Sequence, residues 1–303
     1  MQKQRMSRRD FLGQAALLTG AVSLGSGQAR AASSDAPRRT AVDQVPLGRT
    51  GLRISRLGIG TGSNSGQVQF ALGADGFHRL IRYAYDRGIT YIDAAQGYRT
   101  FEWIGGAIKG LPREKLFLQT KVPGKPANVL EAIDRHRKTF QTDYIDSLLI
   151  HCMVRGNWTE DMKRIMDGFE EAQQKQWIRL KGVSCHSLPA LRAATESSWT
   201  QVHLVRVNPQ AKHVDGDTES WNQPGNQIEP VLEQIRAMHA KGRGVIGMKI
   251  IGNGDFTQPE DREKSIRFAM ACREIDAVVI GFKSPAEIDE AIERMNRALA
   301  GTA

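Results

Sequence analysis

Residues 277–299, AVVIGFKSPAEIDEAIERMNRAL, have the pattern of one complete strand–helix unit. The stretch begins with five apolar or small residues, 277–281, which are typical of a buried strand. Ser284 and Pro285 follow, the usual order of a helix N-cap and a proline in the first helical turn. The pattern therefore predicts a strand over residues 277–281 and a helix over residues 285–299.

The same alternation occurs eight times from about residue 45 onward. The predicted strands cover residues 56–60, 90–94, 116–122, 145–151, 180–184, 203–208, 245–250 and 277–281. The predicted helices include residues 77–87, 103–109, 129–140, 160–176, 189–197, 228–241, 260–273 and 285–299. Eight strands that alternate with helices over roughly 250 residues are what a closed parallel barrel requires. We therefore predict an α/β fold, a (β/α)8 TIM barrel.

Two local patterns refine this prediction. Short β-type runs around Gly48 and Gly51 predict an N-terminal β-hairpin over residues 45–55. The alternative fold is a doubly wound sheet, whose dinucleotide fingerprint is GxGxxG followed directly by a helix. Residues 57–63, LGIGTGS, are rich in glycine but lack that arrangement, which favours the barrel.

The composition is that of a folded globular protein. Of the 303 residues, 40% are hydrophobic, 25% charged and 7% aromatic, which excludes a disordered chain, a collagen-like fibre and a coiled coil. The net charge is +9, but no basic cluster is interleaved with aromatic residues, so we predict no nucleic-acid partner. Cys152, Cys185 and Cys272 cannot all pair, and none lies in a CxxC motif, which argues against a disulfide framework or a zinc ribbon.

Residues 1–31 resemble a twin-arginine signal peptide. Residues 7–12, SRRDFL, resemble the twin-arginine motif, a weakly apolar run follows, and residues 29–31, ARA, match a cleavage site. The resemblance implies export by the Tat translocase and a periplasmic location. Residues 32–44 are predicted to be a flexible lead-in, and residues 45–303 the barrel. No second apolar run reaches the roughly 20 residues of a membrane span, so the mature protein is not expected to span a membrane.

Four polar side chains are predicted at the carboxyl ends of three consecutive strands. Asp93 ends the second strand, Tyr98 lies five residues on, Lys121 ends the third strand and His151 the fourth. Taken singly, each has an ordinary structural explanation. Lys121 could form an ion pair with Asp93, His151 could be a core histidine, and Tyr98 could be an aromatic residue of a surface loop. Together at this rim, where barrel enzymes place catalytic groups, they predict a proton donor. The lysine would lower the tyrosine pKa, the aspartate would hold the lysine, and the histidine would orient a carbonyl oxygen during reduction by hydride.

The chain resembles the aldo-keto reductase family over residues 45–300. Residues 46–62, PLGRTGLRISRLGIGTG, resemble the family's hairpin and first strand, residues 88–98, GITYIDAAQGY, its Asp–Tyr motif, and residues 102–110, EWIGGAIKG, the helix that follows. The resemblance implies that Tyr98 is the general acid, tuned by Asp93 and Lys121, and that His151 positions the carbonyl of a small aldehyde or ketone. It also implies NADPH or NADH as cofactor and no metal.

By the same resemblance, eight residues are expected to bind the nucleotide: Gly60, Thr61, Ser184, Cys185, Met248, Lys249, Lys283 and Ser284. Three positions depart from the family, because Cys185 replaces an asparagine, Leu204 a glutamine and Met248 an aromatic residue. Lys283 and Ser284 precede a helix whose N-terminus suits an anion, which favours NADP over NAD. Glu287 and Ala291 stand where NADPH-preferring members often carry arginine and asparagine, which weakens this preference.

Several alternatives remain open from the sequence. The barrel could bind a nucleotide in a redox-sensing or regulatory role with little turnover, which the departures at Cys185, Leu204 and Met248 favour. A metal-dependent hydrolase could use His186, His213, Asp215 and Asp217, although their spacing is not that of a preformed site. Cys152 and Cys185 are either small buried hydrophobic residues or redox-active thiols. The long polar loop 210–227 is predicted to be either a substrate lid or a surface excursion.

Overall fold

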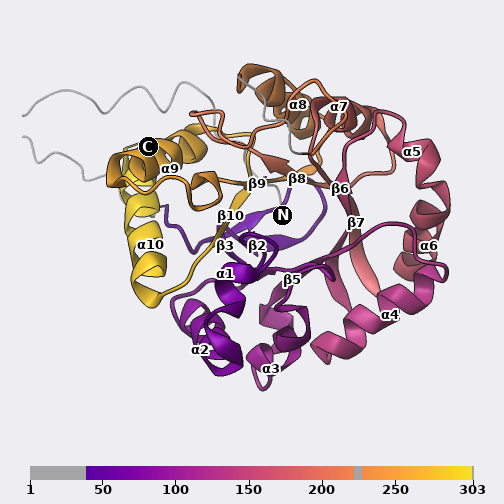
Figure 1. The fold of residues 1–303 in the computed structure, drawn as a ribbon, viewed down its shortest axis with the longest axis horizontal. Helices are drawn as coiled ribbons and strands as arrows, with labels where there is room; N and C mark the ends of the chain where they lie inside the picture. Colours follow the sequence, from indigo (N-terminus) through magenta and orange to yellow (C-terminus); the bar gives the residue numbers. More distant parts are fainter. Residues whose placement is uncertain (1–38, 222–226, 302–303) are drawn as a thin grey trace, which may run out of the picture. The chain divides into compact units, whose positions relative to one another are not determined.

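A computed structural model describes residues 39–221 and 227–301, and eight parallel strands in this part of the chain form a closed barrel (Figure 1). The strands are adjacent in the order β10-β3-β4-β5-β6-β7-β8-β9. Their bounds are β3 Leu57–Gly60, β4 Tyr91–Asp93, β5 Phe117–Val122, β6 Ile145–Met153, β7 Ile178–Cys185, β8 Val202–Arg206, β9 Gly244–Met248 and β10 Ala277–Gly281. The predicted (β/α)8 barrel is confirmed.

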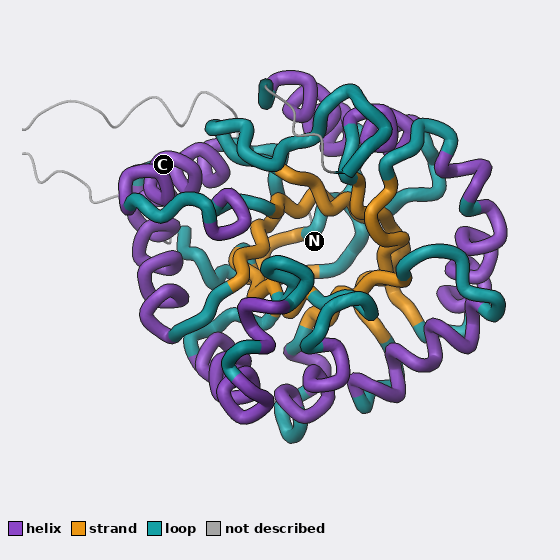
Figure 2. Tube along the Cα trace, in the orientation of Figure 1, coloured by secondary structure: helices purple, strands orange, loops and turns teal. Residues whose placement is uncertain are grey.

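Helices surround the barrel on its outer side, as Figure 2 shows. Their bounds are α1 Gln67–Phe70, α2 Gly73–Asp86, α3 Ile104–Ile108, α4 Val129–Phe140, α5 Trp158–Asp161, α6 Lys163–Gln174, α7 Leu188–Glu196, α8 Glu229–Ala240, α9 Pro259–Ala271 and α10 Pro285–Ala300. Short 3-10 turns cover Phe101–Trp103, Arg113–Lys115 and Gly252–Gly254. The single helix predicted over residues 160–176 is wrong, because Met162 has a non-helical backbone that separates α5 from α6.

The predicted hairpin is confirmed and covers the amino-terminal end of the barrel. Strands β1 (Gln44–Pro46) and β2 (Arg53–Ser55) pair antiparallel. Between them Leu47 is fully buried, and the Gly48 N–H donates to the Asp276 carboxylate just before β10 (3.0 Å). The Arg49 N–H donates to the Gly242 carbonyl before β9 (2.7 Å). Because the hairpin packs on this end, the carboxyl ends of the strands form the end that is available to a substrate.

Part of the predicted lead-in packs on the barrel. Residues 40–43 form a turn in which the Asp43 carboxylate accepts hydrogen bonds from the Thr40 N–H (2.8 Å) and hydroxyl (2.6 Å). Ala41 is fully buried, and its N–H donates to the Asn296 side chain on α10 (2.8 Å). The barrel unit therefore includes residues before position 45. The predicted signal peptide and the first part of the lead-in lie outside the described residues.

The core has two layers, as expected for a filled barrel. Inside the strands, Tyr91 and Phe117 meet edge to face with ring centroids 5.6 Å apart, and Leu149 and Ile246 pack beside them. A larger apolar layer lies between the strands and the helices. Among the helices of the described part, none is long and apolar enough to cross a membrane.

Candidate active site

The structure brings Asp93, Tyr98, Lys121 and His151 together at the carboxyl ends of β4, β5 and β6. The Lys121 ammonium lies 2.8 Å from both Asp93 carboxylate oxygens and donates to the Ala94 carbonyl at 2.8 Å. It also lies 3.4 Å from the Tyr98 hydroxyl oxygen. The rings of Tyr98 and His151 meet edge to face at 5.6 Å. The lysine thus links the aspartate to the tyrosine.

A network of buried polar side chains inside the barrel holds the Asp93 carboxylate in place. The Gln119 amide donates to Asp93 Oδ1 (2.9 Å) and to the Tyr91 hydroxyl (2.8 Å), and its oxygen accepts from the Ser147 hydroxyl (3.0 Å). All of these side chains are buried. Gln119 precedes Lys121 by two residues on β5, so both point to the same face of the strand. Gln119 was not among the predicted site residues, although this two-residue spacing could have identified it.

The Asp93–Lys121 pair is enclosed, with side chains 7% and 1% exposed. Burial alone would lower the pKa of Lys121, but the Asp93 carboxylate offsets this and the pKa lies above its ordinary value. The ammonium therefore stays charged at neutral pH. This agrees with the role predicted for Asp93.

The prediction for the acidity of Tyr98 is wrong in its net direction. Burial raises the pKa of the Tyr98 hydroxyl to about 12, even though the Lys121 ammonium lowers it as expected. Desolvation of the phenolate is therefore the larger effect. The hydroxyl stays protonated throughout the neutral pH range.

His151 is a neutral imidazole in this site. Burial, with a smaller contribution from the Lys121 charge, lowers the pKa of His151 to about 3. A neutral ring carries one N–H, so it can donate one hydrogen bond without adding a charge. This suits a residue that orients a carbonyl oxygen.

Gly62 makes room for the tyrosine. A Cβ atom at residue 62 would lie 2.2 Å from Tyr98 Cζ and 2.7 Å from its hydroxyl oxygen. The strand end beside it is held by Thr61, whose N–H and hydroxyl both donate to the Asp93 carbonyl (3.0 Å each). The sequence predicted no role for Gly62. Its contact with Tyr98 depends on how the loop that carries Tyr98 folds back toward Gly62, and the local sequence does not specify this.

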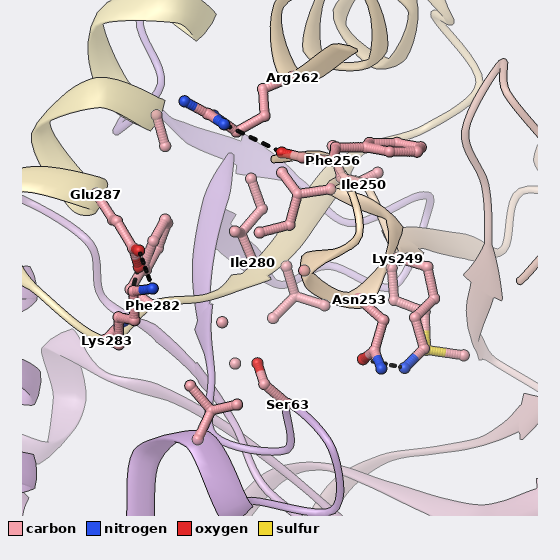
Figure 3. Close-up of a pocket in the computed structure, with 18 of the residues that line it drawn as sticks. Ser63, Lys249, Ile250, Asn253, Phe256, Arg262, Ile280, Phe282, Lys283 and Glu287 are labelled. Atoms are coloured by element: carbon pink, nitrogen blue, oxygen red, sulfur yellow. Dashed lines mark hydrogen bonds and ion pairs between the residues drawn. The ribbon is translucent and has the colours of Figure 1, made fainter. Parts of the chain in front are cut away.

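A cavity of about 750 Å³ opens beside Tyr98 and extends to helix α10. Its tetrad side includes Gly60, Gly62, Asp93, Tyr98 and Met248. Its α10 side consists of Arg262, Lys283, Glu287, Glu290, Ala291 and Arg294. Lys249 and the loop Gly252–Gly254 form part of the wall between them, and Figure 3 shows Lys249 hydrogen-bonded to Asn253. The volume suits a ligand of cofactor size.

The eight residues expected to bind the nucleotide divide into two groups. Gly60, Met248, Lys249 and Lys283 line the cavity. The other four, Thr61, Ser184, Cys185 and Ser284, do not line it.

Each of these four also has a structural role within the protein. The Ser184 hydroxyl accepts from the Cys152 N–H (3.0 Å), and Cys185 belongs to the apolar core. Ser284 caps α10 by accepting from the Glu287 N–H (3.3 Å). Thr61 holds the end of β3 through its hydrogen bonds to the Asp93 carbonyl. The four residues thus support the ends of the strands and the start of α10.

Lys283 is paired within the protein. Its side-chain ammonium lies 3.6 Å from the Glu287 carboxylate, and its backbone N–H donates to the same carboxylate at 2.8 Å. The sequence offered Lys283 as a partner for a phosphate, and the structure shows that its ammonium also has a carboxylate partner.

Arg206, a buried residue at the carboxyl end of β8, was also not among the predicted site residues. Its guanidinium donates to the Asp215 carboxylate (2.7 Å) and to the His186 carbonyl (2.6 Å). Asp215 lies in the long loop, so this pair fixes the described part of that loop to the barrel. Because the predicted strand extended to residue 208, Arg206 was placed inside it rather than at its end.

The two cysteines near the site are protonated. Burial raises the pKa values of Cys152 and Cys185. The Cys152 thiol lies 3.6 Å from His186 Nε2, but an imidazole whose own pKa is well below its ordinary value is a weak base for it. These environments favour the interpretation as small buried side chains.

The residues of the metal-site alternative have separate partners. His213 pairs with Asp255 (2.9 Å), Asp217 with Arg192 (3.1 Å) and Asp215 with Arg206. Within residues 39–221 and 227–301, no three His, Cys, Asp or Glu side chains group as a metal would need.

Comparison with known proteins decides the family. The sequence model described as the Aldo/keto reductase family matches residues 56–273. The chain belongs to the aldo/keto reductase family. Members of this family are oxidoreductases that act on carbonyl groups, and all four tetrad residues lie within the matched region.

Individual proteins of known name resemble the chain over most of its length. An aldehyde reductase of Saccharomyces cerevisiae is 35% identical over 230 residues, which is 72% of this chain and 70% of that one. L-galactose dehydrogenase of Arabidopsis thaliana is 23% identical over 291 residues, 83% of this chain and 87% of that one. An aldo-keto reductase structure from Bacillus halodurans superimposes with a TM-score of 0.66 at 19% identity, over 88% and 97% of the two chains. That structure supports the fold.

Proposed function

We propose that this protein reduces a small aldehyde or ketone with NADH or NADPH, with Tyr98 as the proton donor. One observation carries the proposal: the Lys121 ammonium lies 2.8 Å from Asp93 and 3.4 Å from the Tyr98 hydroxyl, and Asp93 and Tyr98 also line a cavity of cofactor size. The curated relative named an aldehyde reductase supports a small carbonyl substrate.

The donor set of the cavity fits a dinucleotide. Lys249 offers an ammonium whose hydrogen bond goes to the neutral Asn253 side chain (2.7 Å), and burial lowers its pKa to about 8. A bound pyrophosphate would supply a counter-charge for it. Gly252, Asn253 and Gly254 have positive φ, and a Cβ at Gly254 would meet no atom within 4 Å, so a ligand can approach the backbone closely at Gly254. When bound, the dinucleotide supplies the hydride.

The protein's own residues orient the carbonyl oxygen and donate the proton to it. The neutral His151 imidazole donates an N–H that orients the carbonyl oxygen, and the Tyr98 hydroxyl donates to the same oxygen. As negative charge develops there, the proton moves from Tyr98 to the oxygen, because an alkoxide is a stronger base than a tyrosinate. The Lys121 ammonium stabilises the tyrosinate that remains, and Asp93 keeps Lys121 charged and in place. Burial of these groups excludes water and strengthens each interaction.

A labelling experiment tests this proposal. Purified protein is incubated with a simple aldehyde and with NADH or NADPH that carries deuterium at both positions of nicotinamide C4. We expect the absorbance of the reduced nicotinamide to fall and one deuterium to appear on the former carbonyl carbon. Unchanged absorbance over a broad panel of aldehydes and ketones would contradict the proposal.

A regulatory nucleotide-binding barrel is the second candidate. It is favoured by the placement of Ser184 and Cys185, which do not line the cavity and so leave a nicotinamide carboxamide without those two partners. The same experiment separates the candidates, because a regulatory barrel would bind nucleotide, measured by calorimetry, without forming deuterated product.

We also propose export to the periplasm by the Tat translocase. Its support is the sequence of residues 7–12, SRRDFL, with the apolar run and the small-x-small site that follow. Residues 1–44 fused to a folded fluorescent reporter should reach the periplasm. The paired substitution Arg8→Lys and Arg9→Lys should retain the reporter in the cytoplasm, and export of that variant at the original level would contradict the proposal.

A further inference from the structure

Gln119 lies between two polar side chains in the interior of the barrel. In the register of the sheet, Asp93 on β4 is the neighbour of Gln119 on β5, and Ser147 on β6 is its neighbour on the other side. All three side chains are buried. The interior of such barrels is filled chiefly by bulky apolar residues, and a buried polar side chain costs free energy unless it is hydrogen-bonded. A row of three polar residues therefore calls for a reason other than packing.

The Gln119 amide has one orientation that satisfies its neighbours. Its oxygen accepts from the Ser147 hydroxyl (3.0 Å), and its nitrogen donates to Asp93 Oδ1 (2.9 Å) and to the Tyr91 hydroxyl (2.8 Å). The reversed amide would place its oxygen against a carboxylate, which has no proton to donate. Burial raises the pKa of Tyr91 well above its ordinary value, so this hydroxyl stays neutral and can accept. Asp93 thus receives an N–H from a side chain that Ser147 holds at its other end.

Without Gln119, the Asp93 carboxylate would keep a single partner. Among the residues that the structure describes, it is hydrogen-bonded only to the Gln119 amide and to the Lys121 ammonium. That ammonium lies 2.8 Å from both carboxylate oxygens and from the Ala94 carbonyl, but 3.4 Å from the Tyr98 hydroxyl. The contact to Tyr98 is at the long limit of a hydrogen bond, so a small shift decides whether it is made. If the Asp93–Lys121 pair could move as a unit, this contact would be lost first.

We propose that Gln119 is a positioning residue for the reduction: it fixes the Asp93 carboxylate and thereby keeps the Lys121 ammonium within reach of the tyrosine hydroxyl. The inference rests on the proposed function, because it concerns the same proton donation. Gln119 does not line the cavity, so it acts through Asp93 and not on the nucleotide. Its loss should therefore slow proton transfer and leave ligand binding unchanged.

Steady-state reduction of an aldehyde by Gln119→Met tests the inference. Methionine has a similar length and no N–H, so Asp93 loses one of its two partners. The turnover number should fall about tenfold to a hundredfold, since a misplacement of about 1 Å can cost a hundredfold. The Michaelis constant for the aldehyde and the calorimetric dissociation constant for the nucleotide should stay within about twofold, because the lost interaction acts in the transition state. Ser147→Ala, which removes only the partner of the amide oxygen, should lower turnover about threefold.

Gln201→Met is the matched control. Gln201 directly precedes β8, at the amino-terminal end of the barrel, away from the tetrad. Its amide oxygen accepts from the Lys181 N–H (3.1 Å) and from the Gln173 side chain (3.0 Å). The variant thus makes the same change in another hydrogen-bonded glutamine of this barrel, and turnover should stay within about twofold of native. An equal fall in both glutamine variants would overturn the inference, because it would reflect a general loss of barrel rigidity.

Gln119→Glu gives a signature that a loss of packing does not produce. When protonated, the new carboxyl group can accept from Ser147 and donate to Asp93, as the amide does. When ionised, it has no proton to donate and repels the Asp93 carboxylate. Burial and the Asp93 charge raise the pKa of the new carboxyl above its ordinary value, although the Lys121 ammonium opposes this. The titratable groups around this position are Asp93, Tyr91 and Lys121, with Tyr98 and His151 beyond them at the rim.

The protonated form of this variant is the active one, so its turnover is lost as pH rises. Between about pH 6 and about pH 9, turnover of Gln119→Glu should fall about tenfold or more, whereas native turnover stays nearly constant over the same range. A flat profile for Gln119→Glu over that range would overturn the inference. This comparison is made within one folded variant, so it decides the question even if Gln119→Met does not fold.

The outcomes separate this inference from the function on which it rests. If the native protein shows no turnover with any carbonyl compound, the proposed function fails and the inference with it. If the native protein is active and Gln119→Met keeps its turnover within about twofold of native, the inference alone is overturned. A weaker affinity for the nucleotide that accounts for the whole loss of activity in Gln119→Met would also overturn it.

Discussion

Each side of the cavity has a Lys–carboxylate ion pair, and the two pairs differ in how far they are buried. On the tetrad side, the Lys121 and Asp93 side chains are 1% and 7% exposed, and Gln119 holds the carboxylate from within the barrel. On the α10 side, the Lys283 and Glu287 side chains are 67% and 36% exposed. A buried pair is costly to break, because the remaining charge loses its partner in a poorly solvated site. An exposed pair contributes little to stability, so a substitution in the Lys283–Glu287 pair should not endanger the fold.

The largest expected effect comes from breaking the buried pair. Lys121→Met leaves the Asp93 carboxylate without its ammonium and should lower the free energy of unfolding by about 3–5 kcal/mol. Lys283→Met should change it by about 0.5 kcal/mol or less. Urea unfolding of both variants measures the difference. The double variant Lys121→Met with Asp93→Asn should recover part of the loss, and equal effects of the two single substitutions would contradict the comparison.

A smaller effect follows from crowding the tyrosine. Gly62→Ala places a methyl group against the Tyr98 ring, so the hydroxyl must move and the turnover number should fall about a hundredfold. Gly97→Ala is the matched control, since a Cβ at residue 97 meets no atom within 4 Å and should leave turnover within about twofold. Steady-state kinetics at saturating nucleotide measures both variants. Full activity in Gly62→Ala would show that turnover does not depend on the position of the Tyr98 ring and would argue against its role.

The smallest expected effect is the response of reduction to pH. The pKa of Tyr98 is about 12 and that of His151 about 3, so the tyrosine stays protonated and the histidine neutral between about pH 6 and about pH 9. The turnover number for reduction should change by about twofold or less over that range. It should decrease only as pH approaches the Tyr98 pKa, because the proton donor is then lost. A decrease with an apparent pKa of about 7 would assign the proton to another group.

The tetrad could be predicted from the sequence because it depends on topology. Asp93, Lys121 and His151 each lie near the carboxyl end of a strand, and parallel strands in a barrel bring such ends to one rim. The strand–helix alternation was sufficient to predict that rim. The pKa of Tyr98 was not predictable in the same way, since the sequence identifies the neighbouring charge but not the degree of burial, and burial has the larger effect.

The α10 side depended on details that the sequence does not specify. Whether Lys283 is a free cation depends on how the Glu287 side chain folds back over the helix start. Ser184 occupies a position where the family resemblance predicts a ligand contact, but its hydroxyl accepts from the Cys152 N–H, and Cys152 has a positive φ that no sequence pattern signals. Gln119 could have been found from its two-residue spacing to Lys121. Arg206 was not predicted as a site residue, because the predicted strand ran to residue 208. In the structure β8 ends at Arg206, which places this side chain at the rim.

The central claim is that the Tyr98 hydroxyl gives its proton to the substrate oxygen. Tyr98→Phe removes that hydroxyl and keeps the ring, and Tyr83→Phe, which removes a hydroxyl bonded to Asp289 on α10, is its control. The measurement is turnover of aldehyde with each variant, beside calorimetric binding of the nucleotide. We predict that Tyr98→Phe loses turnover by about a hundredfold to ten-thousandfold with nucleotide binding unchanged, while Tyr83→Phe keeps both. Native turnover in Tyr98→Phe would contradict the account.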